Sequence, residues 1–168
     1  IYGNSFDGSW IFDDEPNIIQ NKYIHLKTLA WDNIQKTFHG IDQKKITRPV
    51  AYFTFGLNYY FGQLNPVGYH AVNFLIHFCS AVFLFLFIYR TLNLPLLRAD
   101  YGSSSYSVAL LAVVFWAVNP VQVTAVTYIV QRMASMAGMF YIMSMYFYLL
   151  GRTDEKQGKR IIFFLLSA

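Results

Sequence analysis

An almost continuous apolar segment over residues 69–90 constrains this chain more than any other feature. A helix needs about 20 apolar residues to cross the hydrocarbon core of a bilayer, and this segment has that length. Further apolar runs cover residues 106–118 and 121–150, and another, incomplete, begins at residues 160–168. Because a lipid-exposed backbone must satisfy its own polar groups, runs of this length indicate helices. We predict an all-α membrane protein, a polytopic helical bundle in the lipid bilayer.

The composition supports a membrane protein and argues against a nucleic-acid partner. Hydrophobic residues make up 55% of the chain and charged residues only 13%, whereas a soluble domain carries about 25% charged residues. Acidic and basic residues balance over residues 1–68, so the net charge of +4 arises in short segments between the apolar runs. The single cysteine, Cys79, lies inside an apolar run and excludes an internal disulfide framework.

The positions of the basic residues predict how the chain is oriented. The segment 91–105 contains Arg98, and the segment 152–160 contains four basic residues: Arg152, Lys156, Lys159 and Arg160. Cytoplasmic loops are enriched in Lys and Arg, so both segments are expected in the cytoplasm. Residues 1–68 then form a long first outer loop, in the periplasm of a bacterium or in the lumen of the endoplasmic reticulum. Residues 69–168 form the transmembrane part.

Two features of the outer side depart from simple spans and loops. A helix over residues 106–118 is about 20 Å long, shorter than the hydrocarbon core of about 30 Å. The following Asn119-Pro120 turn is therefore expected below the outer surface, lining a cavity or buried in protein. Within the outer loop, residues 25–38 show apolar residues at helical spacing, which predicts an amphipathic helix. This helix either lies flat on the outer leaflet or packs in a small loop domain.

Polar residues form a stripe on the first predicted span. His70, Asn73, His77 and Ser80 recur at intervals that place them on one face of a helix. Polar groups in lipid need partners, so this face should point into the bundle. The stripe either lines a substrate cavity or metal site, or makes hydrogen bonds between helices. Asn73 and His77 are predicted cavity-lining residues.

Arg132 lies well inside the third apolar run, close to Tyr128 and Gln131, which are also predicted to line the cavity. An arginine near the bilayer centre costs at least about 2.5 kcal/mol, so such a residue is a functional hypothesis by default. Its expected partner is an anion, either a carboxylate of the outer loop or a lipid phosphate, which arginine binds with two parallel hydrogen bonds. The alternative is an arginine that reaches the surface from a tilted helix end.

The outer loop supplies a cluster of acids directly behind aromatic residues. Phe12-Asp13-Asp14-Glu15 places three carboxylates side by side. A carboxylate just outside a membrane cavity is suited to act as a general base. The alternatives are a solvated turn and a loop in which Asp13 and Asp14 bind a divalent cation.

Several motifs resemble those of a known family. Asn4-Ser5-Phe6 and Phe12-Asp13-Asp14 resemble the first outer loop of membrane proteins that couple a multi-span glycosyltransferase to tetratricopeptide repeats. The resemblance continues in order and spacing through nearly the whole chain, at Ile18 and Asn21, Arg48-Pro49-Val50, Phe55-Gly56-Leu57-Asn58-Tyr59, Gly68-Tyr69-His70-Ala71-Val72-Asn73, His77 and residues 119–132. The chain is thus similar to protein O-mannosyltransferases, which belong to the glycosyltransferase C superfamily.

This resemblance implies a bundle of many helices with a catalytic first outer loop. It implies a sugar donor carried on a polyprenyl monophosphate and an acceptor hydroxyl on an exported protein. Asp13 would take the acceptor proton, and Asp14 would orient the acceptor or bind a divalent cation. Arg132, helped by Arg48 or His70, would offset the charge on the departing lipid phosphate. No residue identifies the sugar, for which mannose is one candidate.

The resemblance has one departure, and other functions stay open. Many relatives carry His-Pro where this chain has Asn119-Pro120, so no histidine role is carried over to this turn. A membrane scaffold or accessory subunit of a larger assembly would keep the fold without transferring sugar. A transporter of a lipid-linked substrate would need the same deep arginine and polar stripe. The acid pair beside the membrane favours the enzyme.

Overall fold

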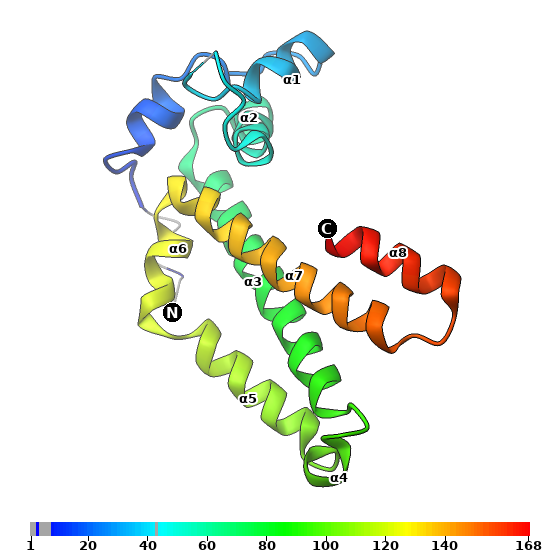
Figure 1. Ribbon diagram of the computed structural model, residues 1–168. Helices are drawn as coiled ribbons and strands as arrows, with labels where there is room; N and C mark the ends of the chain where they lie inside the picture. The colour runs from blue at the N-terminus through cyan, green and yellow to red at the C-terminus, as the bar shows by residue number, and fades with distance from the viewer. Residues whose placement is uncertain (1–2, 4–7, 43) are drawn as a thin grey trace. The chain divides into compact units, whose positions relative to one another are not determined.

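The computed structural model describes residue 3, residues 8–42 and residues 44–168, and every regular element in these parts of the chain is helical (Figure 1). The predicted all-α class is confirmed. The Asn4-Ser5-Phe6 motif lies outside the described residues.

The chain divides into two compact units. The first comprises Ile1–Leu75 and Val123–Met136, and the second comprises Ile76–Gln122 and Ala137–Ala168. The first unit therefore contains the loop that precedes the first predicted span, together with the opening turns of α3 (Pro66–Leu92). The division at residue 68 into an outer loop and a membrane part stays a prediction about the position of the bilayer.

Residues 8–42 and 44–65 of the first unit contain three helical elements before α3. They are the short π-helical turn η2 (Glu15–Ile19), α1 (Trp31–Thr37) and α2 (Pro49–Gly62). Helix α2 was not predicted from the sequence. It begins with a proline at its first position, where the missing N–H has no intrahelical partner to lose. Its buried residues lie at helical spacing and include Phe55 and Gly56.

The predicted amphipathic helix over residues 25–38 is wrong in its length, because α1 occupies only the second half of that range. Ala30, immediately before α1, has an extended backbone. The His25 ring stacks on the Tyr59 ring of α2, with 4.1 Å between the ring centres. This contact holds the start of the predicted helix against α2, and tertiary packing overrides the local helical pattern.

The third apolar run is also not one helix, as had been predicted for residues 121–150. It consists of η3 (Pro120–Gln122), α6 (Val123–Thr127) and η4 (Ile129–Gln131), followed by α7 (Arg132–Thr153). Tyr128 adopts an extended conformation between α6 and η4 and breaks the helix there. The side chains that stabilise this break are described with the site below.

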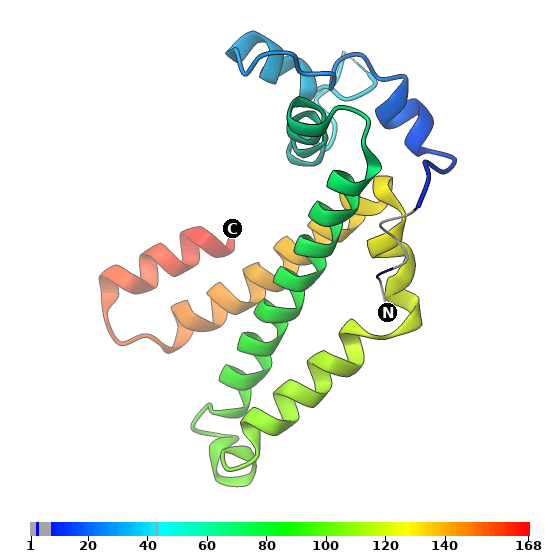
Figure 2. The same ribbon diagram turned by 180° about the vertical axis from the view of Figure 1, so that it is seen from behind.

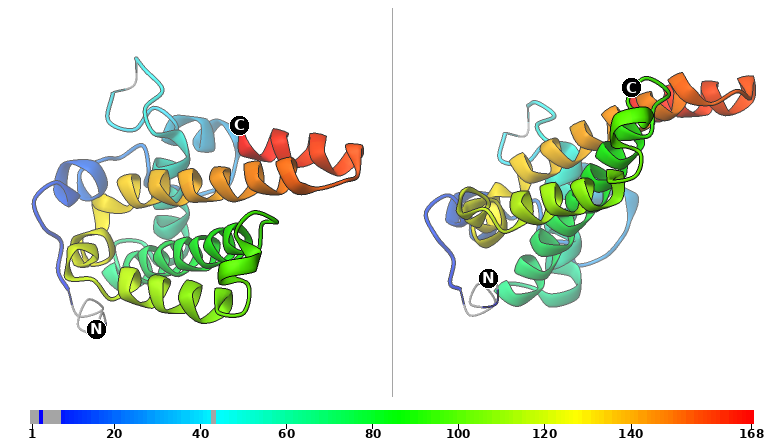
Figure 3. Two further views of the ribbon diagram at one scale, coloured as in Figure 1. Left: turned by 60° about the horizontal axis from the view of Figure 1, so that its bottom comes forward. Right: turned by 90° about the horizontal axis from the view of Figure 1, so that it is seen from below.

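The second unit contains two helical hairpins. After the short α4 (Arg98–Tyr101), α5 (Ser105–Ala117) returns towards the start of the unit (Figure 2). The side-chain amide of Asn93 donates to the Ser105 hydroxyl at 2.9 Å and joins the two ends of this connection. After α7 (Arg132–Thr153), α8 (Gln157–Ser167) folds back beside it (Figure 3).

The described helices include two that are long and apolar enough to cross a membrane. They are Pro66–Leu92 and the continuous stretch Ile129–Thr153. Ser105–Ala117 and Pro120–Thr127 meet the same criterion only as a pair, and they are bent by 53° at their junction, as in a broken span or a re-entrant loop. The chain is an all-helical membrane protein, and its described residues contain two candidate spans, or three if the bent pair counts as one.

We predict that Gly40→Ala destabilises the first unit. Gly40 has a φ of +59°, and a Cβ there would overlap the ring of Tyr52, whose hydroxyl donates to the Asn17 side chain at 2.7 Å. A non-glycine residue in the left-handed region costs about 1–3 kcal/mol, and the overlap adds to this. Thermal unfolding of the purified full-length protein measures the effect. Gly62→Ala, with open space around Gly62, is the control. Equal melting temperatures for the two variants would contradict the prediction.

Candidate functional site

Arg132, the first residue of α7, is fully buried and forms four hydrogen bonds within the first unit. Its Nε donates to Asn73 Oδ1 at 2.7 Å. One terminal nitrogen donates to Asn58 Oδ1 at 2.7 Å and to Thr54 Oγ1 at 3.3 Å. The other donates to the carbonyl oxygen of Tyr69 at 2.9 Å. All four acceptors are uncharged, so dipoles of the protein replace the water lost by the cation.

Aromatic faces complete the surroundings of this guanidinium. Its central carbon lies 4.4 Å from the centre of the Phe55 ring and 5.6 Å from that of Tyr69. Helix α2 therefore contributes Thr54, Phe55 and Asn58 to the cluster. Phe55 and Asn58 belong to a motif that carries the family resemblance, but none of the three residues was predicted to belong to the site. Thr54 and Asn58 stand four positions apart in an apolar segment, as two polar residues on one helical face would.

Asn73 connects Arg132 to the break between α6 and η4. While its Oδ1 accepts from Arg132, its Nδ2 lies within hydrogen-bonding distance of the carbonyl oxygens of Val126, Tyr128 and Ile129, at 3.2–3.4 Å. The carbonyls of Tyr128 and Ile129 also accept from the backbone N–H groups of Gln131 and Arg132, so Asn73 adds a side-chain donor at the break, where the protein must satisfy the backbone polar groups. Asn73 is fully buried and supplies the donor.

Asp14 accepts a hydrogen bond from a backbone N–H at the same break. Its Oδ1 accepts from the backbone N–H of Val130 at 2.8 Å, and its Oδ2 accepts from the N–H of Ile11 at 3.0 Å. The side chain is 1% exposed. Burial raises the pKa of this carboxyl above its ordinary value, while the two backbone hydrogen bonds act in the opposite direction. Asp14 therefore attaches the acidic turn to η4.

Asp13 has the opposite environment from its neighbour. Its side chain is exposed, and its backbone is fixed on both sides. Its N–H donates to the Tyr128 hydroxyl at 3.0 Å, and its carbonyl accepts from the Asn17 amide at 2.8 Å. The preceding residue, Phe12, is 86% exposed with a φ of 40°, a strained backbone for a bulky side chain. Strain of this kind is frequent at functional sites.

Two further residues that were predicted to bind the lipid phosphate, His70 and Arg48, lie in the first unit. His70 is 2% exposed, and neither ring nitrogen makes a hydrogen bond within the described residues, although Asp14 and the Gly8 backbone lie near enough to act on it electrostatically. Arg48 is exposed, and its Nη1 lies 3.1 Å from the sulfur of Met133. Of the predicted phosphate-binding residues, Arg48 presents its charge to solvent, whereas His70 and Arg132 are buried.

The predicted cavity-lining residues fall into both units. Tyr128 and Gln131 are half-buried at the two ends of η4, next to the cluster around Arg132. His77 lies in the second unit, where its Nε2 is 3.0 Å from the Ala117 carbonyl oxygen and its ring stacks on Trp116. The structure thus gives His77 a hydrogen bond between helices, and its role in a cavity stays a prediction.

The described residues contain no group of three or more His, Cys, Asp or Glu side chains able to hold a metal ion. Both carboxylate oxygens of Asp14 already accept backbone hydrogen bonds. A cation shared by Asp13 and Asp14 would have to compete with these amides.

The chain is similar to several proteins that are named protein O-mannosyl-transferases. It is 30% identical over 167 residues to protein O-mannosyl-transferase TMTC4 of Homo sapiens, covering 94% of this chain and 22% of that protein. It is 32% identical over 146 residues to TMTC3 of Mus musculus, covering 84% and 15%, and 32% identical over 155 residues to tmtc2 of Xenopus laevis, covering 89% and 17%. No family model and no solved structure matches it.

These similarities, together with the apolar helices, define a helical membrane protein related to glycosyltransferases. The chain is homologous to the protein O-mannosyl-transferases over nearly its whole length, which confirms the resemblance predicted from its motifs. It spans between 15% and 22% of the length of the relatives named above.

We predict that Asn58→Ala destabilises the protein more than an ordinary polar-to-alanine change. The substitution removes an acceptor from a buried cation, and a hydrogen bond to a charged group contributes about 1.5–3 kcal/mol. Gln35→Ala on the exposed face of α1 removes a similar amide and serves as the control. Denaturant or thermal unfolding of the full-length protein distinguishes the two. A loss no larger than that of the control would show that Arg132 does not need this acceptor.

Proposed function

We propose that this chain is the catalytic outer-loop portion of a glycosyltransferase. The whole protein would move a sugar from a polyprenyl monophosphate to a hydroxyl of an exported protein, and mannose is the sugar in the names of its relatives. The observation that carries the proposal is the pair of adjacent acids. Asp13 is exposed on a fixed backbone, whereas Asp14 is buried and both of its carboxylate oxygens accept backbone hydrogen bonds.

Asp13 is the proposed general base. Its exposed carboxylate is available to an acceptor, and the hydrogen bonds at its N–H and carbonyl fix where it lies. In the proposed step the acceptor oxygen attacks the anomeric carbon and transfers its proton to Asp13. The bond between this carbon and the phosphate oxygen breaks, and the electron pair leaves with the lipid phosphate. The configuration at the anomeric carbon is inverted, because one displacement occurs.

The proposed contact with the lipid phosphate is Arg48, because its charge is exposed in the same unit as Asp13. Arg132 is proposed as a positioning residue that acts through Asn73 on the break to which Asp14 is attached. For Arg132 to contact the phosphate directly, as the sequence suggested, its hydrogen bonds to Asn58, Thr54 and Tyr69 would have to open.

We predict that the two acids respond differently to the same substitution. Asp13→Asn should lower transfer about 10²–10⁴-fold, the usual contribution of a general base, without changing the melting temperature. Asp14→Asn should lower stability by about 1–3 kcal/mol, because its new amide donors would face a backbone N–H at Ile11 or Val130.

The assay is transfer of radiolabelled sugar from polyprenyl phosphate to exported protein, in membranes that contain the full-length protein, with unfolding measured in parallel. Full transfer by Asp13→Asn would remove this acid from the mechanism. Absence of transfer by the wild type with every donor tested would favour the scaffold.

We also propose that residues 8–65 lie on the non-cytoplasmic side, as the basic segments suggest. In a Cys79→Ala background, cysteines at Ser104 and Gln157 should react with an impermeant reagent in sealed vesicles whose cytoplasmic face is outward. A cysteine at Lys44 should react only after the vesicles are permeabilised. All three positions are exposed, so differences in labelling report sidedness. The reverse labelling pattern would invert the orientation.

A further inference from the structure

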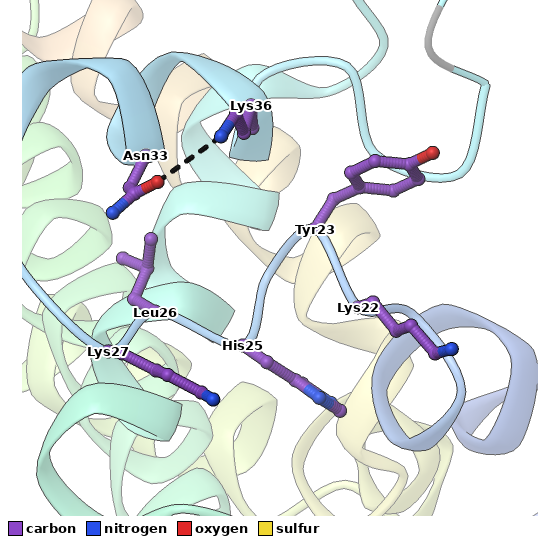
Figure 4. Close-up of a pocket in the computed structure, with 7 residues that line it drawn as sticks. All are labelled: Lys22, Tyr23, His25, Leu26, Lys27, Asn33 and Lys36. Atoms are coloured by element: carbon purple, nitrogen blue, oxygen red, sulfur yellow. Dashed lines mark hydrogen bonds between the residues drawn. The ribbon is translucent and has the colours of Figure 1, made fainter.

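The first unit carries a basic hollow whose lining does not include the acid pair. The hollow has a volume of about 330 Å³ and lies between the chain at residues 22–27 and helix α1 (Figure 4). Its lining side chains are Lys22, Tyr23, His25, Leu26, Lys27, Asn33 and Lys36. We call this feature the basic hollow.

Among the described residues, the lining of the basic hollow contains three lysines and no acidic side chain. All three lysines are exposed, and none forms an ion pair in the described part of the chain. The Lys36 ammonium lies 3.4 Å from Asn33 Oδ1. The Asn33 amide nitrogen in turn donates to the Thr28 hydroxyl. Like charges gathered without a counter-charge repel one another, so an anion in the hollow would relieve the repulsion.

A buried donor beside the basic hollow also lacks an acceptor. Asn21 is 5% exposed, and its Nδ2 has no hydrogen-bond partner among the described residues. Asn21 lines a second hollow of about 400 Å³ that shares Lys22 and Tyr23 with the first. Buried polar groups without partners are uncommon, and an oxygen-rich ligand reaching this side of Lys22 would supply the acceptor.

Large apolar side chains are exposed on the same segment as the lysines. Tyr23 is 45% exposed, Leu29 47% and Trp31 62%. Lysines that meet phosphates, next to Trp and Tyr at the level of the headgroups, are typical of a surface in contact with a bilayer. The first unit also contains the opening turns of both Pro66–Leu92 and Ile129–Thr153, the candidate spans, which places this unit next to a membrane surface.

We propose that the basic hollow binds the phosphate of an anionic phospholipid headgroup, with Leu29 and Trp31 resting in the adjoining interfacial layer. Lys22, Lys27 and Lys36 supply the positive charge, and Asn33 supplies an uncharged donor. Asn21, in the adjoining hollow, supplies a donor to the part of the headgroup that extends past Lys22. This binding site is independent of sugar transfer. It anchors the first unit to the outer leaflet by lipid contacts of its own.

The test measures binding of phosphatidylserine and phosphatidylcholine to the purified full-length protein by native mass spectrometry. Lys22→Gln/Lys27→Gln should weaken phosphatidylserine binding about 25-fold, or about fivefold for each lysine, since one lysine near an anionic surface contributes about 1 kcal/mol. Lys44→Gln/Lys45→Gln removes the same charge from exposed lysines outside the hollow and should leave this binding within about twofold of the wild type. Lys22→Arg/Lys27→Arg should retain it.

Two further binding measurements distinguish a lipid from other anionic ligands. Inorganic phosphate and an acidic peptide are each offered in place of lipid. Binding of either probe at the hollow without binding of phosphatidylserine overturns the lipid assignment, as does equal weakening by the two lysine-to-glutamine pairs. Unchanged binding in Lys22→Gln/Lys27→Gln, with an unchanged melting temperature, also overturns it. If this double variant does not fold, the single variant Lys27→Gln is compared with Lys45→Gln.

Discussion

The positive charge of Arg132 has no access to water, so the protein itself must solvate it. Helix α2 supplies Thr54 and Asn58, and the first turns of α3 supply the Tyr69 carbonyl and Asn73. Desolvation of a charge costs several kcal/mol unless its donors are paired, so a displacement of any one of these segments leaves the cation poorly solvated. The arrangement of α2, α3 and the start of α7 in the first unit therefore depends on one side chain.

The break before α7 connects this cation to the acid pair. Asn73 meets carbonyl groups across the break, from Val126 to Ile129, and Asp14 meets the N–H of Val130 in η4. Asp14 is committed to the backbone, whereas Asp13, at the preceding position, is exposed. Two identical side chains thus acquire different environments, one of them because a broken helix must satisfy its polar groups.

Structural features that depend on local composition were predicted from the sequence, whereas features that depend on contacts between residues far apart in the chain were not. The span over residues 69–90 is visible in its own apolar residues. The break at Tyr128 is invisible locally, because neither neighbour, Thr127 or Ile129, is a proline or glycine and its partners, Asn73 and Asp14, are far away in the chain. Arg132 was recognised as unusual, but a buried cation suggested an anionic partner, whereas the structure solvates it with amide, hydroxyl and carbonyl oxygens. The shortened α1 likewise reflects packing of His25 on Tyr59, which no helical pattern records.

The hydrogen bond between Asp14 and Val130 joins residues 116 positions apart, and this separation bears on biosynthesis. At an elongation rate of about 5–20 residues per second, the ribosome needs roughly 6–23 s to proceed from one partner to the other. During that time the segment around Asp13 has left the ribosome, while η4 and the residues that fix the acidic turn are still unmade. Folding of this turn must therefore wait for insertion of the later helices into the membrane. Until then the segment is exposed to chaperones and proteases, so slower membrane insertion lengthens this exposure.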